Sequence, residues 1–263
     1  MMEPSKDREI KDQEHEHPEH EDPELSFFEH LVELRSRLLK ACFTVLVVLI
    51  VLLPFSRKLY ALLAIPLTAV LPEGSSMIAI DVASPFLIPF KLSLLLALLL
   101  SIPVVLYQLW AFVAPALYLK EKRLARPLLY SAVVLFYTGC AFAYFVVFPL
   151  VFGFFTRVAP EGVTVMTDIS KYLDFVTTLF LAFGITFEVP IATIILVATG
   201  ITTVEKLSKM RGYVLVGAFA LGMMLTPPDV ISQTLLAVPM WLLFEIGLLM
   251  SRILLPHRDN EKN

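Results

Sequence analysis

The sequence has little charge, few cysteines and none of the common catalytic motifs. Charged residues make up 17% of the 263 positions, and the two cysteines, Cys42 and Cys140, stand in apolar runs without a metal or redox spacing. No G-x-x-x-x-G-K-[ST] loop is present to bind phosphates, no H-E-x-x-H pair to bind zinc and no G-x-S-x-G turn to carry a nucleophile. These absences argue against an enzyme and indicate neither a cofactor nor a metal site.

Apolar residues, in contrast, make up 57% of the chain, above the roughly 45 to 50% of soluble proteins. The charges are concentrated at the N-terminus, where residues 1–25 hold 10 of the 24 acidic and 3 of the 21 basic residues. This acidic, His-rich segment has almost nothing apolar to bury, so we predict a disordered, solvated tail rather than a metal site. An acidic tail also offers no surface for binding nucleic acid.

Six apolar segments follow the tail, and we interpret them as transmembrane helices, each of which needs about 20 mostly apolar residues. The fifth segment is short, because at about 1.5 Å per residue it falls below the roughly 30 Å hydrocarbon core. The sequence therefore predicts an all-α membrane protein with a domain over 26–252 and a C-terminal tail over 253–263. The predicted spans are 38–55, 90–113, 127–155, 172–199, 213–226 and 231–250.

The flanks of the first span have patterns of their own. Ser26 and Glu29 form a capping box ahead of an amphipathic helix, which we expect to lie at the bilayer surface. Residues 57–89 contain several prolines and apolar pieces too short to cross, which predicts an ordered extracytoplasmic loop. Pro103, Pro149 and Pro190 lie inside or near the end of helical runs and are expected to kink them.

The positive charges predict an orientation. Six spans place both termini on one side, and the segments on that side carry 16 of the 21 Lys and Arg residues. By the positive-inside rule both termini are cytoplasmic, which makes residues 253–263 a cytoplasmic tail.

Two carboxylates fall inside predicted spans. Glu188 lies well within span four, in FGITFEVPIA, where a charge costs about 2.5 to 3.5 kcal/mol on insertion scales. Intramembrane ionisable residues often mark functional sites, but Glu188 could instead be neutral and bond to a backbone group freed by Pro190. Glu245 in span six is nearer the cytoplasmic end and could reach water, so the two interpretations stay balanced there.

Two further carboxylates, Glu33 and Glu121, stand on the predicted cytoplasmic face among basic residues. The simpler interpretation of Glu33 is an i, i+4 pair with Arg37, worth about 0.2 to 0.5 kcal/mol. Glu121 could be neutralised by Lys122 or Arg123. Taken alone, neither residue indicates a site.

Six sequence strings resemble the TatC family, the large subunit of the twin-arginine protein translocase. They occur in the family's order between His30 and Arg252, and the acidic tail lies outside the resemblance. The strings are HLVELRSRLL (30–39), MIAIDVASPF (77–86), LYQLWAFVAPALY (106–118), FAYFVVFPL (142–150), FEVPIA (187–192) and LTPPDVISQTLLAVPM (225–240).

The resemblance implies a concave six-helix bundle in the bacterial inner membrane. It further implies a non-enzymatic receptor that binds signal peptides carrying two adjacent arginines on folded cargo. Such a receptor recruits TatA-like and TatB-like single-span subunits for transport driven by the proton gradient, and associates with further copies of itself. The alternative is a proton-coupled small-solute transporter using Glu188, but the six spans show no repeat of the kind many secondary transporters have.

The resemblance also assigns residues. It implies that Glu33 and Glu121 bind the two arginines of the signal peptide, with Arg35 and Phe112 beside them. A guanidinium takes a bidentate, charge-assisted pair of bonds from a carboxylate, which a lysine cannot reproduce. Residues implied in partner contact or translocation are Glu188, Pro66, Asp229, Tyr144 and Glu245.

Overall fold

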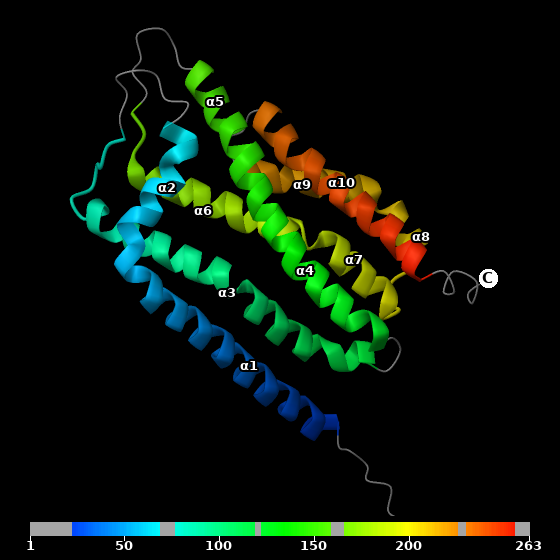
Figure 1. The fold of residues 1–263 in the computed structure, drawn as a ribbon. Coiled ribbons are helices and arrows are strands. Elements are labelled where there is room, and N and C mark those ends of the chain that lie inside the picture. The colour runs from blue at the N-terminus through cyan, green and yellow to red at the C-terminus, as the bar shows by residue number, and fades with distance from the viewer. Residues whose placement is uncertain (1–22, 69–76, 119–121, 159–165, 226–229, 256–263) are drawn as a thin grey trace, which may run out of the picture.

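The described part of the chain is helical almost throughout. The computed structural model describes residues 23–68, 77–118, 122–158, 166–225 and 230–255 (Figure 1). These ranges form no strand, only one isolated bridge between Ile78 and Asp168. The all-α prediction is therefore confirmed for the described residues. Of the tail over 1–25 that the sequence predicts to be disordered, residues 1–22 fall outside the described ranges, and residues 23–25 are instead the first residues of α1.

The helices differ widely in length, and some are interrupted. A 3₁₀ turn, Leu53–Phe55, follows α1, and a π-helical turn η2, Ala143–Val147, joins α4 to α5. The helices are α1 (Pro23–Leu52), α2 (Ser56–Thr68), α3 (Ser84–Tyr118), α4 (Lys122–Phe142), α5 (Phe148–Val158), α6 (Ile169–Thr186), α7 (Val189–Ala198), α8 (Val204–Lys209), α9 (Arg211–Leu225) and α10 (Val230–Leu254).

Five helical segments of the described chain are long and apolar enough to cross a membrane: 31–65, 84–112, 126–154, 169–198 and 233–254. The chain is thus a multi-pass membrane protein. The segment predicted as span five is α9, whose 15 residues extend for about 22 Å. The sixth crossing therefore remains a prediction, and α9 has the short length that the sequence indicates.

The structure corrects two expectations about the first third of the chain. Residues 57–89 are not simply a loop, because α2 occupies Ser56–Thr68 and α3 already begins at Ser84. The first helix does not begin at the predicted cap Ser26, because α1 already starts at Pro23 and runs without interruption into the first span. The place of its first turns at the bilayer surface stays a prediction. Packing against neighbouring helices overrides local proline signals here, as tertiary context often does.

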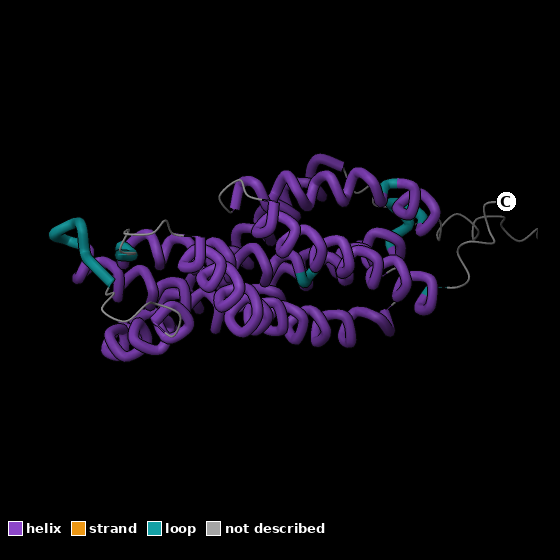
Figure 2. Tube along the Cα trace, turned by 90° about the horizontal axis from the view of Figure 1, so that it is seen from above, coloured by secondary structure: helices purple, strands orange, loops and turns teal. Residues whose placement is uncertain are grey.

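Both ends of the described chain lie at the same end of the bundle. The end of α3, the start of α4, α8 and the end of α10 lie on the right of Figure 1, with the start of α1 at the lower right, and we call this the terminal end. The start of α6, most of α2 and the end of α5 lie at the opposite end. Figure 2 shows the tube as helix throughout most of its length, with loops mainly at these two ends.

Each end has its own buried core. At the terminal end α3, α4, α7, α8 and α10 meet around Trp110, Leu128, Ile194, Val204 and Phe244. At the opposite end the core is larger and more aromatic, with Leu63, Leu92, Phe148, Tyr172 and Phe183 among its members. Inside a membrane such helices associate through close packing and interhelical hydrogen bonds, since lipid chains are as apolar as leucine.

Candidate functional site

Glu33 stands at the terminal end of the bundle, on the edge helix α1. Its side chain is 37% exposed, and Oε1 accepts a hydrogen bond of 2.9 Å from Arg37 Nε and a second from the same guanidinium. The expected i, i+4 pair is therefore formed. A carboxylate held in this way is oriented and partly exposed, and carboxylates form strong charge-assisted hydrogen bonds with guanidinium groups.

Phe112 lies on α3, which packs beside α1 along much of its length (Figure 1). The two helices run in opposite directions, so the start of α1 and the end of α3 share the terminal end. Trp110, two residues earlier, is buried and anchors α3 in the terminal-end core. The structure thus brings Glu33 and the half-buried Phe112 to one end, with the exposed Arg35 on α1. Glu121 lies outside the described residues.

Glu188 occupies a break in the fourth crossing segment. α6 ends at Thr186 and α7 begins at Val189, with Pro190 in its first turn, where a missing N–H does no harm. The proline kink expected from the sequence is therefore found. Among the described residues, Glu188 Oε1 is buried and has no hydrogen-bond partner, so this oxygen does not form the expected bond to a backbone group freed by Pro190.

Two glycines allow neighbouring helices to approach this break closely. A Cβ on Gly139 of α4 would lie 2.6 Å from the Phe183 carbonyl oxygen and 2.9 Å from Phe187 Cγ. A Cβ on Gly247 of α10 would lie 2.9 Å from the Cα of Pro190. Small residues at such crossings are the usual means of close helix packing in membranes.

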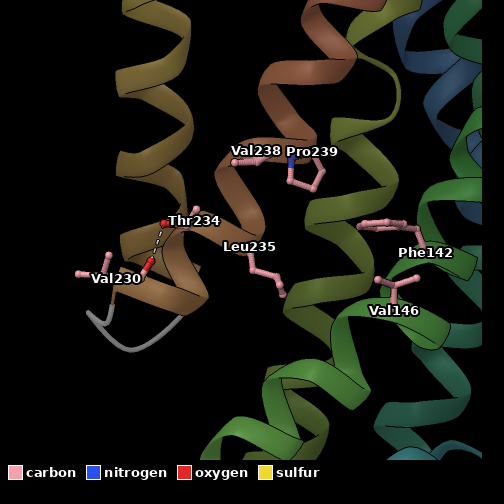
Figure 3. A pocket seen from close by; sticks show the side chains of 7 residues that line it. All are labelled: Phe142, Val146, Val230, Thr234, Leu235, Val238 and Pro239. Carbon is pink, nitrogen blue, oxygen red and sulfur yellow. Dashed lines mark hydrogen bonds between the residues drawn. The ribbon is translucent and has the colours of Figure 1, made fainter.

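An apolar pocket of about 520 Å³ lies beside the break, between α10 and the α4–η2 junction (Figure 3). Phe142 lines the pocket and also packs against Phe187, with ring centroids 5.7 Å apart. This ring therefore connects the pocket to the residue next to Glu188. The other lining residues are Val146, Val230, Thr234, Leu235, Val238 and Pro239.

Glu245 differs from Glu188 because it has a cationic partner. Arg211 of α9 places Nε 2.7 Å from Glu245 Oε1, and its second nitrogen donates to Oε2 at 2.9 Å. No local sequence pattern indicates this partner, because Arg211 lies 34 positions away, in the preceding short helix. Glu245 therefore joins α9 to α10 near the terminal end.

The other candidates lie toward the opposite end. The Tyr144 hydroxyl, in the π-helical turn, donates to the Leu62 carbonyl oxygen at 3.2 Å. Pro66 belongs to the same helix α2 as Leu62. No sequence pattern connects Tyr144 with Pro66, yet the fold brings their segments together. Asp229 lies outside the described residues.

The fold and these residues define a class: a multi-pass, all-helical membrane protein with a partly exposed acidic group at an end of the bundle and another acidic group, with one buried oxygen, at a helix break. The model of the family "Sec-independent protein translocase protein (TatC)" matches residues 29–239. The chain belongs to the TatC family.

Individual relatives agree with this assignment. The Sec-independent protein translocase protein TatC of Haemophilus influenzae is 59% identical over 230 residues, covering 88% of this chain and 90% of the relative. The protein of the same name from Escherichia coli K12 is 60% identical over 223 residues, with coverages of 85% and 86%. A crystal structure of a twin-arginine translocase receptor, TatC, is 37% identical, with a TM-score of 0.75 over 85% of this chain and 98% of that chain.

Proposed function

We propose that this chain is the receptor and core subunit of a twin-arginine translocase, which binds the paired arginines of signal peptides on folded cargo. The observation that carries the proposal is the partly exposed Glu33, oriented by Arg37 at the terminal end, in a chain that belongs to the TatC family. Glu33 and Glu121 take one arginine each, with Arg35 and Phe112 beside them. The role is binding and transport, without a catalytic step.

The proposed orientation has the terminal end facing the cytoplasm of a bacterium, with the chain in the inner membrane. The basic segments at this end support it, since they hold most of the Lys and Arg residues. Single cysteines at Lys206 and at Ala79, introduced after replacing Cys42 and Cys140, test it by labelling with a membrane-impermeant thiol reagent in intact cells. We expect Ala79→Cys to be labelled and Lys206→Cys to be protected, and the reverse pattern would overturn the orientation.

The membrane-embedded part contacts the single-span TatA-like and TatB-like partners in this proposal. Glu188 supports the idea because its buried Oε1 lacks a hydrogen-bond partner among the described residues, and a polar group on a partner helix would supply one. The adjacent apolar pocket offers packing surface for such a helix. Pro66, Tyr144, Asp229 and Glu245 act in translocation rather than in signal-peptide binding, and copies of the chain associate in a larger complex.

Photocrosslinking tests the receptor role directly. A photoreactive residue at Leu34, which is exposed beside Glu33, is combined with a signal peptide carrying Arg-Arg and with the same peptide carrying Lys-Lys. Both peptides have equal charge, so only the planar, bidentate guanidinium distinguishes them. We expect crosslinks with Arg-Arg and a large loss with Lys-Lys. Equal yields would mean that general electrostatic attraction, and not recognition of the arginine pair, brings the peptide to α1.

A further inference from the structure

Two prolines remove hydrogen-bond donors from helices at the opposite end and near the middle of the bundle. In an α-helix the N–H of each residue donates to the carbonyl four positions earlier, and proline has no N–H. Pro66 in α2 therefore leaves the Leu62 carbonyl without its helical donor, and Pro103 in α3 does the same for Leu99.

Tyrosine hydroxyls supply the missing donor at both carbonyls. Tyr144 donates to the Leu62 oxygen at 3.2 Å, and Tyr137 donates to the Leu99 oxygen at 3.1 Å. Both acceptors are the i−4 carbonyls that the two prolines free. The same arrangement occurring twice, on two different helices, argues against coincidence.

The two tyrosines are seven residues apart on α4 and the adjoining turn η2. Seven residues are close to two helical turns, so the two side chains project from about the same face, two turns apart. At these two levels different helices lie opposite that face. The Tyr137 hydroxyl therefore reaches α3, and the Tyr144 hydroxyl, in the π-helical turn Ala143–Val147, reaches α2.

A third tyrosine secures the next carbonyl of α2. Tyr172 of α6 is 2% exposed and donates to the Leu63 oxygen at 2.7 Å. A row of rings joins it to Tyr144: Tyr144–Phe148, Phe148–Phe152 and Phe152–Tyr172 have centroids 6.1, 5.8 and 5.4 Å apart. Two consecutive carbonyls in the middle of α2 are thereby bound from two other helical segments.

We propose that Tyr137, Tyr144 and Tyr172 are positioning residues: the first two replace the hydrogen bonds lost at Pro103 and Pro66, and together the three fix α2 and α3 against α4 and α6 for translocation. Where lipid covers a helix, no water can donate a hydrogen bond to an unsatisfied carbonyl. The tyrosine hydrogen bond therefore matters more there than it would in a soluble protein. The arrangement also gives Pro66 a physical role, because it reserves the Leu62 carbonyl for an interhelical bond. Only the clause about translocation rests on the proposed function.

Restoring the helical donor tests the inference. In the Pro66 background, Tyr144→Phe removes the replacement donor for Leu62, and we expect the Tm in lipid nanodiscs to fall by about 2 to 4 °C. In the Pro66→Ala background the alanine N–H can donate to Leu62, so Tyr144→Phe should lower the Tm by less than half as much. The pair Tyr137→Phe and Pro103→Ala repeats the cycle independently on α3.

Tyr130→Phe is the matched control, since Tyr130 lies on the same helix, seven residues before Tyr137, and is 75% exposed. It should leave the Tm unchanged in every background. Equal losses from Tyr144→Phe in the Pro66 and Pro66→Ala backgrounds would overturn the inference, because the hydroxyl would then act independently of the proline. If Tyr144→Phe does not accumulate while the Pro66→Ala, Tyr144→Phe double variant does, the same rescue is seen at the level of folding.

Transport of a folded reporter provides the second readout. Tyr144→Phe should reduce transport several-fold while signal-peptide crosslinking at Leu34 stays at the unmodified level, and Pro66→Ala should restore part of the transport to the Tyr144→Phe variant. Unchanged transport in Tyr144→Phe would refute the translocation clause. Loss of the Arg-Arg preference in the unmodified chain would instead refute the proposed function, and the Tm cycle would still decide the structural part.

Discussion

Glu33 and Glu188 are the same residue type in opposite surroundings. The Glu33 side chain is 37% exposed and forms an ion pair with Arg37 of its own helix. Glu188 sits at a helix break, with Oε1 buried and without a hydrogen-bond partner among the described residues. The first is suited to a cationic ligand arriving from water, whereas the second is suited to a polar group arriving within the membrane.

The helices that carry the two residues differ in the same way. Segment 31–65 contains most of α1, and only 6% of the residues in its most apolar part are buried within the protein. In segment 169–198, which contains Glu188, the corresponding share is 50%. α1 is therefore an edge helix, with most of its surface outside the protein core. The break at Glu188 is embedded among α4, α6 and α10, so changes there affect packing as well as binding.

The largest effect should come from removing the charge at Glu33. Glu33→Gln keeps the shape but loses charge-assisted hydrogen bonds worth about 1.5 to 3 kcal/mol, so signal-peptide affinity should fall about 10- to 150-fold. Binding of a labelled Arg-Arg peptide to the chain in nanodiscs measures this. Glu205→Gln is the matched control, an exposed acid in the first turn of α8 at the terminal end. Undiminished binding to Glu33→Gln would show that Glu33 does not bind the peptide and only pairs with Arg37 in its own helix.

A smaller but still large effect should follow from a single methyl group at the break. Gly139→Ala would place Cβ 2.6 Å from the Phe183 carbonyl oxygen, and relief requires backbone movement, which costs about 1 to 3 kcal/mol. We expect a Tm lower by several degrees and impaired transport, with Arg-Arg peptide binding retained at Glu33. Gly217→Ala has nothing within 4 Å of its Cβ and should be neutral or slightly stabilising. Similar Tm values for both variants would show that α4 can move away from α6.

The sequence predicts the crossing helices well because long apolar runs have few alternatives in a membrane. It also indicates the break at Pro190, since a proline in a helical run disturbs it in almost any context. The helix α2 within residues 57–89 does not follow from the sequence. Their prolines suggest a loop, but Tyr144 and Tyr172 bind the carbonyls of α2 from distant parts of the chain. No local pattern reports such a bond.

The candidate sites also divide into features with a local sequence pattern and contacts between distant parts of the chain. The pair of Glu33 with Arg37, four residues away, and the position of the ionisable Glu188 within an apolar run both follow from sequence, whereas the binding role of Glu33 is implied only by the family resemblance. The partner of Glu245 does not, because Arg211 is brought to it only when α9 folds back along α10. The pocket beside Phe142 is also invisible in the sequence, since its lining combines two segments about 90 positions apart.

Glu188 should matter to partner contact more than to stability. One interhelical hydrogen bond in a membrane is worth about 0.6 kcal/mol on average and at most about 1.7, so Glu188→Ala should weaken partner docking about 3- to 20-fold. Disulfide crosslinking from Ala192→Cys, which is exposed on α7, to a cysteine on the partner helix measures this. Asp174→Ala, an exposed acid on α6, is the control. Wild-type crosslinking in Glu188→Ala would remove the partner role, and a parallel loss of Tm and of all activities would make the residue structural.

The smallest effect should come from Glu245. Its side chain is less exposed than that of Glu33 and, unlike Glu188 among the described residues, it has a cationic partner. Its side chain is 25% exposed and that of Arg211 46%, so the ion pair should contribute only about 0.2 to 1 kcal/mol. α9 packs on α10 through a small core of Ala218, Ala237 and Met240, so the pair should limit local opening of α9. Hydrogen exchange in α9 should therefore rise about 1.4- to 5-fold in Arg211→Gln.

Glu245→Gln should raise exchange in α9 by the same factor, and the double variant should add nothing further, because either change removes the same pair. High salt should shrink the difference from the unmodified chain, since the pair is partly exposed to water. Lys209→Gln, which removes a neighbouring exposed charge at the end of α8, should leave the exchange unchanged. If Glu245→Gln abolishes transport while Arg211→Gln does not, the pair cannot be the reason. Glu245 would then act in its own right, as a second intramembrane carboxylate beside Glu188.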